Sequence, residues 1–187
     1  MALFVERFQI DGVVLVRPPK FADARGYFVE TYNAKRFAEA GVEGVFVQDN
    51  QSLSVAKGVV RGLHFQTPPE AQAKLVRVLR GSIFDVAVDL RLGSPTYGQW
   101  CAATLTGEGG EQLFIPRGFA HGFCTLEANT EVAYKVDALY APACDAGLRW
   151  DDPDLAIKWP VGKDDVQISD KDSKLPFFRD FQTPFTL

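Results

Sequence analysis

Two histidines, the only ones in this 187-residue chain, have the types of neighbour that allow proton chemistry. His64 lies in residues 61–66 and His121 lies in residues 115–123, and both segments are apolar and contain glycine. Imidazole changes its charge near neutral pH, so a buried pair is suited to moving protons. The adjacent glycines allow a ligand or another backbone to come close. The alternative is that each histidine is a core residue whose ring bonds a backbone carbonyl.

A lysine and a tyrosine could complete such a site. Lys74 follows His64 by ten positions, so a chain reversal in residues 67–73 would return it beside the imidazole. Tyr134 lies in a strand-like segment after His121. A base, an ammonium group and a phenol suit proton abstraction next to a carbonyl: the base takes the proton, the ammonium stabilises the enolate oxygen, and the phenol returns a proton to the other face. Spacing alone, however, favours an exposed strand lysine and a half-buried sheet tyrosine.

Inward-facing histidines in a β-barrel would also suit a metal site. Such sites need three or four His and carboxylate ligands, usually with a close His-x-His pair. His64 and His121 are 57 positions apart, and the chain has no third histidine. Two histidines and carboxylates could still form a site, but we expect a barrel without metal.

The elements that must position these residues are β-strands, because the main hydrophobic period is two. Residues 82–90 alternate between an apolar face and a face with two acids: Phe84, Val86, Val88 and Leu90 against Asp85, Ala87 and Asp89. We predict a hairpin of residues 74–79 and 82–90 around a turn at Gly81. The other predicted strands are 12–16, 27–31, 45–52, 59–65, 100–105, 112–115, 122–126 and 131–136. A short helix is predicted at 34–40, ended by Gly41.

Composition indicates one domain over residues 1–187, because 47% hydrophobic residues suffice for one sizeable core. The 16 glycines and 11 prolines separate the strands at short intervals, which favours an antiparallel sandwich or barrel. Residues from Trp150 onward are richer in Asp and Pro and are expected to form a loop-rich cover over the barrel.

Charge and cysteine content narrow the class of protein. The formal net charge of −4 argues against a nucleic-acid binder, and no apolar run is long enough to cross a membrane. Three cysteines without CxxC spacing are typical of reduced thiols in the cytoplasm. Residues 1–8 contain Glu6 and Arg7 and no long apolar core, so we expect no signal peptide.

An ordered series of motifs runs along nearly the whole chain, from about residue 21 to 176. The motifs lie at residues 25–30, 48–52, 61–66, 74–78, 84–91, 94–98, 115–123, 150–153 and 169–172. Together they resemble the dTDP-4-dehydrorhamnose 3,5-epimerase family of the dTDP-L-rhamnose pathway. The resemblance implies an all-β fold, a double-stranded β-helix jelly roll (cupin-like barrel) with a few short helices. It also implies a homodimer, with N-terminal strands exchanged at the interface, that uses no cofactor and no metal.

The resemblance also implies the reaction and its residues. The substrate would be dTDP-4-dehydro-6-deoxy-D-glucose, inverted at C3 and C5 to give dTDP-4-dehydro-L-rhamnose. Four positions match the family's catalytic residues: the base His64, its partner Asp172, the proton donor Tyr134 and the enolate-stabilising Lys74. The matched substrate-binding positions are Arg25, Phe28, Glu30, Gln48, Asn50, Arg61, His121 and Tyr140, with Tyr140 stacked on the base of the nucleotide. Asp170 lies two positions from Asp172 and is an alternative partner for His64.

Two other functions compete with this interpretation. Some members of the family invert only C3 or only C5, or act on related nucleotide 4-keto sugars. A sugar-binding jelly roll without catalysis would need Arg61 and the aromatic residues, but it would have little use for a set of His, Lys and Tyr. The complete acid–base set therefore favours the double epimerase.

Overall fold

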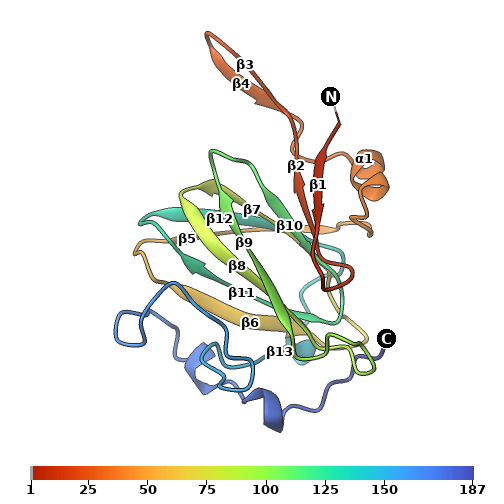
Figure 1. The fold of residues 1–187 in the computed structure, drawn as a ribbon, viewed down its shortest axis with the longest axis vertical. Helices are drawn as coiled ribbons and strands as arrows, with labels where there is room; N and C mark the ends of the chain where they lie inside the picture. The colour runs from red at the N-terminus through yellow and green to blue at the C-terminus, as the bar shows by residue number, and fades with distance from the viewer. Residues whose placement is uncertain (1) are drawn as a thin grey trace.

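Two antiparallel sheets face each other and form a barrel (Figure 1). The computed structural model describes residues 2–187, so Met1, the first residue of the expected 1–187 domain, lies outside the described residues. The first sheet has the order β1 (Phe4–Arg7), β2 (Val14–Arg17), β10 (Gln112–Ile115), β7 (Lys74–Arg80), β12 (Thr130–Val136) and β5 (Gln48–Ser54). The second has the order β13 (Asp145–Gly147), β6 (Val60–Gln66), β11 (Phe119–Thr125), β8 (Ser82–Asp89) and β9 (Trp100–Thr106). This architecture confirms the predicted all-β, jelly-roll class.

The predicted hairpin of residues 74–79 and 82–90 is wrong. β7 pairs with β10 and β12 in the first sheet, whereas β8 pairs with β9 and β11 in the second. Gly81, with a φ of +81°, lies at the corner where the chain passes from one sheet to the other, and a Cβ there would be 2.4 Å from Thr130 Oγ1. The residues between His64 and Lys74 also pass between sheets, so β6 and β7 face each other across the barrel instead of pairing.

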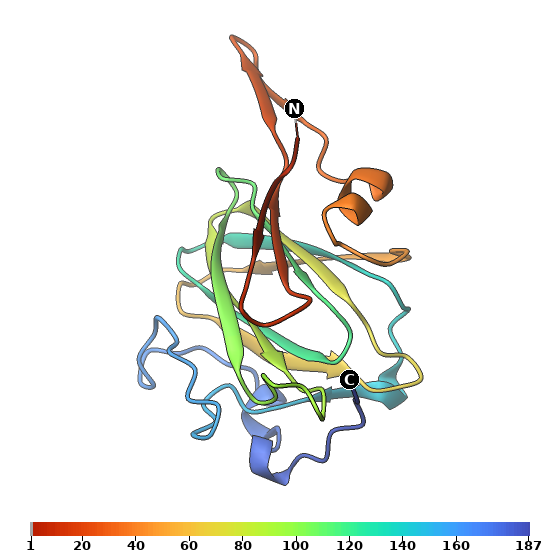
Figure 2. The ribbon, with the colours of Figure 1, turned by 45° about the vertical axis from the view of Figure 1, so that its right-hand side comes forward.

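β8 is buried on both faces. Its residues Ile83 and Ala87 belong to the cluster between the two sheets, together with Leu105, Leu113 and Phe123. The opposite face packs against the C-terminal segment, residues 150–187, which is blue in Figure 2 and runs along the outside of the second sheet. Among the residues that form this outer cluster are Val86, Val88, Leu148, Leu155 and Phe185. The C-terminal segment contains the short 3-10 helices Asp172–Lys174 and Phe178–Asp180.

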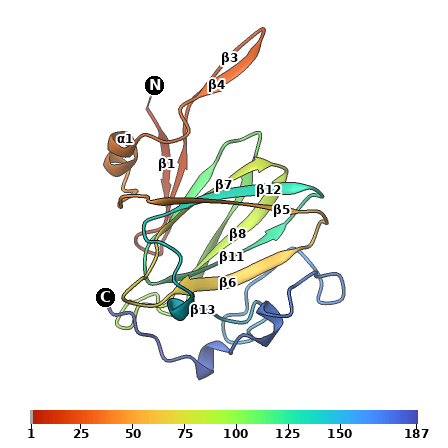
Figure 3. The same cartoon turned by 180° about the vertical axis from the view of Figure 1, so that it is seen from behind.

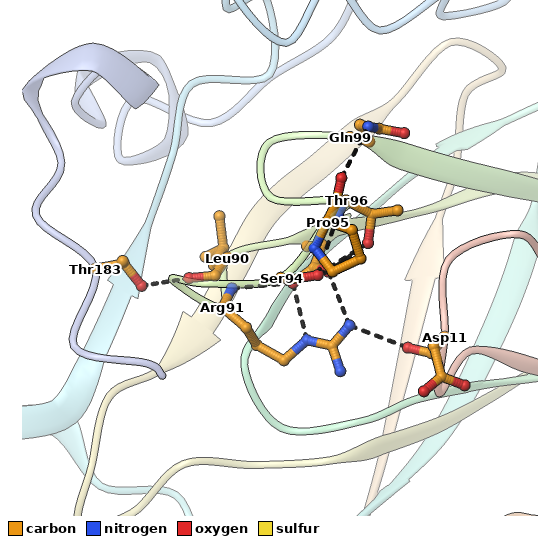
Figure 4. A network of polar contacts seen from close by, with 9 residues as sticks. Asp11, Leu90, Arg91, Ser94, Pro95, Thr96, Gln99 and Thr183 are labelled. Carbon is orange, nitrogen blue, oxygen red and sulfur yellow. Dashed lines mark hydrogen bonds and ion pairs between the residues drawn. The ribbon is translucent and has the colours of Figure 1, made fainter. Parts of the chain in front are cut away.

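A polar network lies at the C-terminal end of β8 (Figure 4). Asp89 is fully buried, and it accepts hydrogen bonds from Arg91, Ser94 and Thr96 at 2.6–2.9 Å. Arg91 also donates to the backbone oxygen of Asp11 at 3.1 Å. Burial alone would raise the pKa of Asp89, but the hydrogen bonds outweigh the effect of burial and lower the pKa to about 2. The carboxylate therefore stays charged and ties the β8–β9 connection to the N-terminal part of the chain.

The N-terminal region carries two features outside the barrel. α1 (Ala34–Glu39) begins after Asn33, whose side chain accepts a hydrogen bond from Arg36 N at 3.2 Å. Its residue Phe37 packs against β2, and Figure 3 shows the helix beside the N-terminal strands. β3 (Lys20–Asp23) and β4 (Gly26–Val29) form a hairpin that projects away from the sheets (Figure 1). We call this hairpin the arm.

Candidate active site

A cavity of about 460 Å³ opens between the two sheets. It is lined by five of the predicted catalytic and binding residues from the barrel strands, together with one from the C-terminal segment: Arg61, His64, Lys74, His121, Tyr134 and Asp172. An adjoining recess of about 340 Å³ shares three of these, His64, Lys74 and Tyr134, and adds Gln48, Asn50 and Tyr140. The structure thus brings together nine of the twelve predicted site residues.

His64 forms a dyad with Asp172. His64 Nε2 lies 2.7 Å from Asp172 Oδ1, and the two side chains are 33% and 6% exposed. Burial alone would raise the pKa of Asp172, but the hydrogen bond and charge of His64, and the donors Gly62 N and Ser169, lower it. A charged Asp172 fixes the proton of neutral His64 on Nε2. The lone pair is then on Nδ1, which has no hydrogen-bond partner in residues 2–187. Asp170, the alternative partner, is exposed.

His121 forms a second His–carboxylate pair, with Asp85. His121 Nε2 lies 2.6 Å from Asp85 Oδ1, and both residues are buried, with side chains 7% and 0% exposed. Burial lowers the pKa of His121, although the charge of Asp85 opposes the change. His121 is therefore a neutral imidazole near pH 7 and donates its Nε2 proton to Asp85.

The glycines beside the histidines serve close backbone packing. His64 and His121 are paired residues on β6 and β11, and a register shift follows between His121 and Phe123. A Cβ on Gly62, whose φ is +121°, would lie 2.5 Å from Gly122 Cα and 2.7 Å from the oxygen of His121. Of the two uses that the sequence left open, a ligand or another backbone, the backbone of the neighbouring strand fills this space. The tight packing fixes both imidazoles on one face of the sheet.

Lys74 approaches His64 from the opposite sheet. Its Nζ donates to the backbone oxygen of His64 at 3.3 Å, and the residue is 9% exposed. Burial lowers the pKa of Lys74 to about 8, and the charges of Asp85 and Asp145 oppose a larger fall. Lys74 is therefore mostly an ammonium ion at pH 7. Its remaining N–H groups have no acceptor in the part of the chain that the structure describes.

Tyr134 and Arg61 lie on opposite sheets at the same cavity. Burial raises the pKa of Tyr134, with an opposing effect from the charge of Arg61, so the phenol is protonated at neutral pH. The Tyr134 hydroxyl bonds no other group within residues 2–187. Arg61 is held by two hydrogen bonds of 3.2 Å, from Nε to Ser54 Oγ and from Nη2 to the oxygen of Leu53. The guanidinium is exposed and can donate further bonds.

The recess is built from amide and aromatic side chains. Gln48 Nε2 donates to Asn50 Oδ1 at 2.9 Å, and Gln48 Oε1 accepts from the backbone nitrogen of Tyr140 at 3.1 Å. Tyr140 is 56% exposed at the rim, and its hydroxyl donates to Asp145 at 3.3 Å. An exposed aromatic ring beside polar groups can stack on a planar ligand.

Three predicted residues do not reach the cavity of their own chain. Arg25 and Phe28 are on the arm, where Phe28 is 69% exposed and Arg25 forms an ion pair with Asp23. Glu30 follows the arm and lies 2.9 Å from Arg36.

Three further polar residues at the site, Lys171, Ser169 and Asp85, were not predicted from the sequence. Lys171 lies at the junction of the cavity and the recess and forms an ion pair with Asp145. Lys171 and Ser169 flank the predicted Asp172 in the motif at 169–172, which could have indicated them. Asp85 lies in the middle of a strand whose neighbouring residues are apolar, and that contrast was its signal. Within residues 2–187, no group of three or more His, Cys, Asp and Glu side chains is placed to hold a metal ion.

The sequence and the fold of this chain are similar to those of known proteins. A sequence model described as dTDP-4-dehydrorhamnose 3,5-epimerase matches residues 7–180. A protein of that name from Sinorhizobium fredii is 52% identical over 174 residues, 93% of this chain and 89% of that protein. A Legionella pneumophila 3,5-epimerase structure in complex with dTDP-4-keto-L-rhamnose has a TM-score of 0.91 and 46% identity, and the match covers 96% of this chain and 95% of that one.

One relative carries a narrower name. A dTDP-4-dehydrorhamnose 3-epimerase from Streptomyces niveus is 42% identical over 167 residues, 89% of this chain and 80% of that protein. Nevertheless, the family model covers almost the whole chain, and the more similar relative is named for both positions. This chain belongs to the dTDP-4-dehydrorhamnose 3,5-epimerase family.

Proposed function

We propose that this protein inverts C3 and C5 of dTDP-4-dehydro-6-deoxy-D-glucose and thereby forms dTDP-4-dehydro-L-rhamnose without a cofactor. One observation carries the proposal: His64 and Tyr134 line one cavity from opposite sheets, β6 and β12. A sugar ring held between the sheets would present one face to the imidazole and the other to the phenol. Removal of a proton on one face and its return on the other inverts a carbon.

Each inversion follows the same steps. Nδ1 of His64 takes the proton from the carbon next to the C4 ketone, and the electron pair of the C–H bond moves to the ketone oxygen. The Lys74 ammonium stabilises the resulting enolate oxygen. The Tyr134 hydroxyl then protonates the carbon from the opposite face, and the enolate collapses to the ketone. Solvent returns a proton to the tyrosinate and removes one from the imidazolium, while Asp172 stabilises that imidazolium.

The remaining polar groups are suited to hold the nucleotide part. Arg61 offers a planar fork of donors to a diphosphate, and Lys171 offers a second cation at the junction with the recess. The amides of Gln48 and Asn50 and the ring of Tyr140 would contact the nucleoside in that recess. His121, with its Nδ1 acceptor, would contact the sugar.

The arm supports a homodimer in which each subunit completes the other's site. An isolated two-stranded hairpin is only marginally stable in water. On the arm the aromatic side chains of Tyr27 and Phe28 are 62% and 69% exposed, which is typical of a surface that another protein chain covers. Packing against a second copy would cover these rings and bring Arg25, Phe28 and Glu30 toward the partner's recess.

The three free cysteines fit a protein of the reducing cytoplasm.

A mono-epimerase that inverts only C3 is the second candidate, because a relative at 42% identity carries that name. The product's configuration separates the two. The purified protein is incubated with dTDP-4-dehydro-6-deoxy-D-glucose, and the ring couplings are read by NMR. We expect a sugar inverted at both C3 and C5. A product inverted only at C3 would assign the narrower activity, and unchanged substrate would contradict both.

A further inference from the structure

Asp85 is a buried carboxylate with one oxygen that no hydrogen bond satisfies. It lies on β8 and is 0% exposed. Oδ1 lies 2.6 Å from His121 Nε2, while Oδ2 has no hydrogen-bond partner in residues 2–187. Buried carboxylate oxygens without partners are rare, because the charge loses its hydration. Asp85 therefore needs a positive charge nearby.

His121 is not that charge. Burial lowers the pKa of His121, so its imidazole is neutral at pH 7 and contributes one N–H donor. In residues 2–187, Lys74 is the buried Lys or Arg side chain; it lies on β7 in the opposite sheet and lines the same cavity as His121. Asp85 and Lys74 are both buried in the barrel, and the negative charge of Asp85 acts on Lys74.

Lys74 also depends on its surroundings for its charge. Titratable groups near Lys74 come from β6 (Arg61 and His64), β8 (Asp85), β11 (His121), β12 (Tyr134), β13 (Asp145) and the C-terminal segment (Lys171 and Asp172), whereas β5 contributes Gln48, Asn50 and Ser52, which do not titrate. Of these, the carboxylates of Asp85 and Asp145 favour the ammonium form, and Asp85 has the larger effect. Asp145 is shared with Lys171, with which it forms an ion pair. Of these two carboxylates Asp85 is the buried one, and the neutral His121 is the one partner within ion-pair distance of it in residues 2–187.

We propose that Asp85 is a positioning residue for the epimerisation: one carboxylate oxygen fixes the tautomer of His121, and the charge on the other keeps Lys74 an ammonium ion. This inference rests on the proposed function, in which the Lys74 ammonium stabilises the enolate. Because His121 donates Nε2–H to Asp85, its Nδ1 is left as an acceptor for a sugar hydroxyl. The Asp85 side chain thereby sets the protonation of two groups in the cavity: the Lys74 ammonium, which donates hydrogen bonds, and His121 Nδ1, which accepts them.

The test compares Asp85→Asn with wild type. Asparagine has the size of aspartate and can still accept a bond from His121, but it carries no charge. The ligand-free proteins, labelled with ¹³Cε-lysine, are titrated by NMR, and the Lys74 signal is assigned by its loss in Lys74→Arg. We expect Lys74 to lose its proton at lower pH in Asp85→Asn. A fall of its pKa from about 8 to about 7 would make the loss of kcat/KM about fivefold larger at pH 8 than at pH 6.

Asp89→Asn is the matched control. Asp89 is a buried acid on the same face of β8, but its charge is satisfied by Arg91. This variant should lower the melting temperature and leave the Lys74 titration where it is. If Asp85→Asn does not fold, the variant Asp85→Asn/His121→Gln replaces the pair by two amides that can bond each other. It should also lower the Lys74 pKa, whereas His121→Gln alone, which retains Asp85, should not.

An unchanged Lys74 titration in every folded variant that lacks the Asp85 charge would overturn the inference. A loss of activity that is equal at pH 6 and pH 8 would also overturn it, because that pattern indicates a purely structural role. The NMR titration needs no substrate, so it decides the role of Asp85 even if the wild-type protein fails to epimerise the dTDP sugar.

Discussion

His64 and His121 lie directly opposite each other on the adjacent antiparallel strands β6 and β11, and each holds Nε2 against a different carboxylate. Asp172 reaches His64 from the C-terminal segment, while Asp85 reaches His121 from within the barrel. The His64 side chain is 33% exposed and that of His121 is 7% exposed. Of these two neighbouring imidazoles, His64 is therefore accessible to a substrate as a base, whereas His121 is buried and neutral and forms hydrogen bonds.

The dyad predicts a sharp difference between two nearby aspartates. Asp172→Asn should lower kcat by roughly 10²–10⁴-fold, because an amide no longer fixes the His64 tautomer or stabilises the imidazolium. Asp170→Asn, two positions away and exposed, should leave kcat near that of wild type. Steady-state kinetics on both folded variants measure the difference. Equal losses in the two variants would remove Asp172 from its assigned role.

Arg61 is expected to contribute to binding of the diphosphate. Arg61→Ala removes charge-assisted donors, which are worth about 1.5–3 kcal/mol, so the affinity for dTDP should fall by roughly 10- to 100-fold. Arg80→Ala is the control, because Arg80 is an exposed arginine outside the cavity. Calorimetry on both variants gives the affinities. Unchanged dTDP binding by a folded Arg61→Ala protein would place the diphosphate elsewhere.

Mixed subunits test whether the arm acts on the partner. The variant Arg25→Ala/Phe28→Ala has a defective arm and an intact cavity, while His64→Asn has the reverse. Each should be impaired alone, and co-refolding the two should restore activity, because half of the sites in a mixed dimer would combine an intact cavity with an intact arm. If the mixture is no more active than the sum of its parts, the arm serves its own subunit.

Asp89 predicts a pH dependence of stability. The pKa of Asp89 is about 2 in the folded protein, against about 3.9 in an unfolded chain, so folding stabilises the charged form of this carboxyl group. This contribution, on the order of 2 kcal/mol, is fully present above about pH 5 and is lost as the pH falls toward 2. Asp89→Asn should unfold at lower urea concentration at pH 7, and its deficit should shrink from pH 5 to pH 2. A deficit independent of pH would contradict this account.

The sequence predicted the strand content better than the strand pairing. Period-two alternation located most strands within a few residues, but it could not show that the chain changes sheets at Gly81. β1, β3 and β13 were not predicted, since they have three or four residues and β1 is exposed along its whole length. The alternation in residues 82–90 also could not show that both faces are buried, because the covering segment follows far along the chain.

The site was predictable mainly through the ordered motifs. His64 and Asp172 are 108 positions apart, and no local spacing joins them. The placement of Lys74 beside His64 was predicted from a chain reversal, whereas the structure reaches it by a passage between sheets. Asp85 required the packed structure, because burial distinguishes a functional acid from a solvated one, whereas Lys171 is exposed and was indicated only by its place beside Asp172 in the motif at 169–172.

The division of labour between His64 and Tyr134 is tested most directly by NMR in deuterated water with dTDP-4-dehydro-6-deoxy-D-glucose. Wild type should incorporate deuterium at C3 and C5 with inversion, and His64→Asn should lose exchange and inversion together, by roughly 10²–10⁴-fold. Tyr134→Phe keeps the base and the Lys74 cation, so exchange should persist with retained configuration while inversion is depressed. Thermal melts establish that each variant is folded. A folded Tyr134→Phe protein that inverts both centres at the wild-type rate would contradict the account.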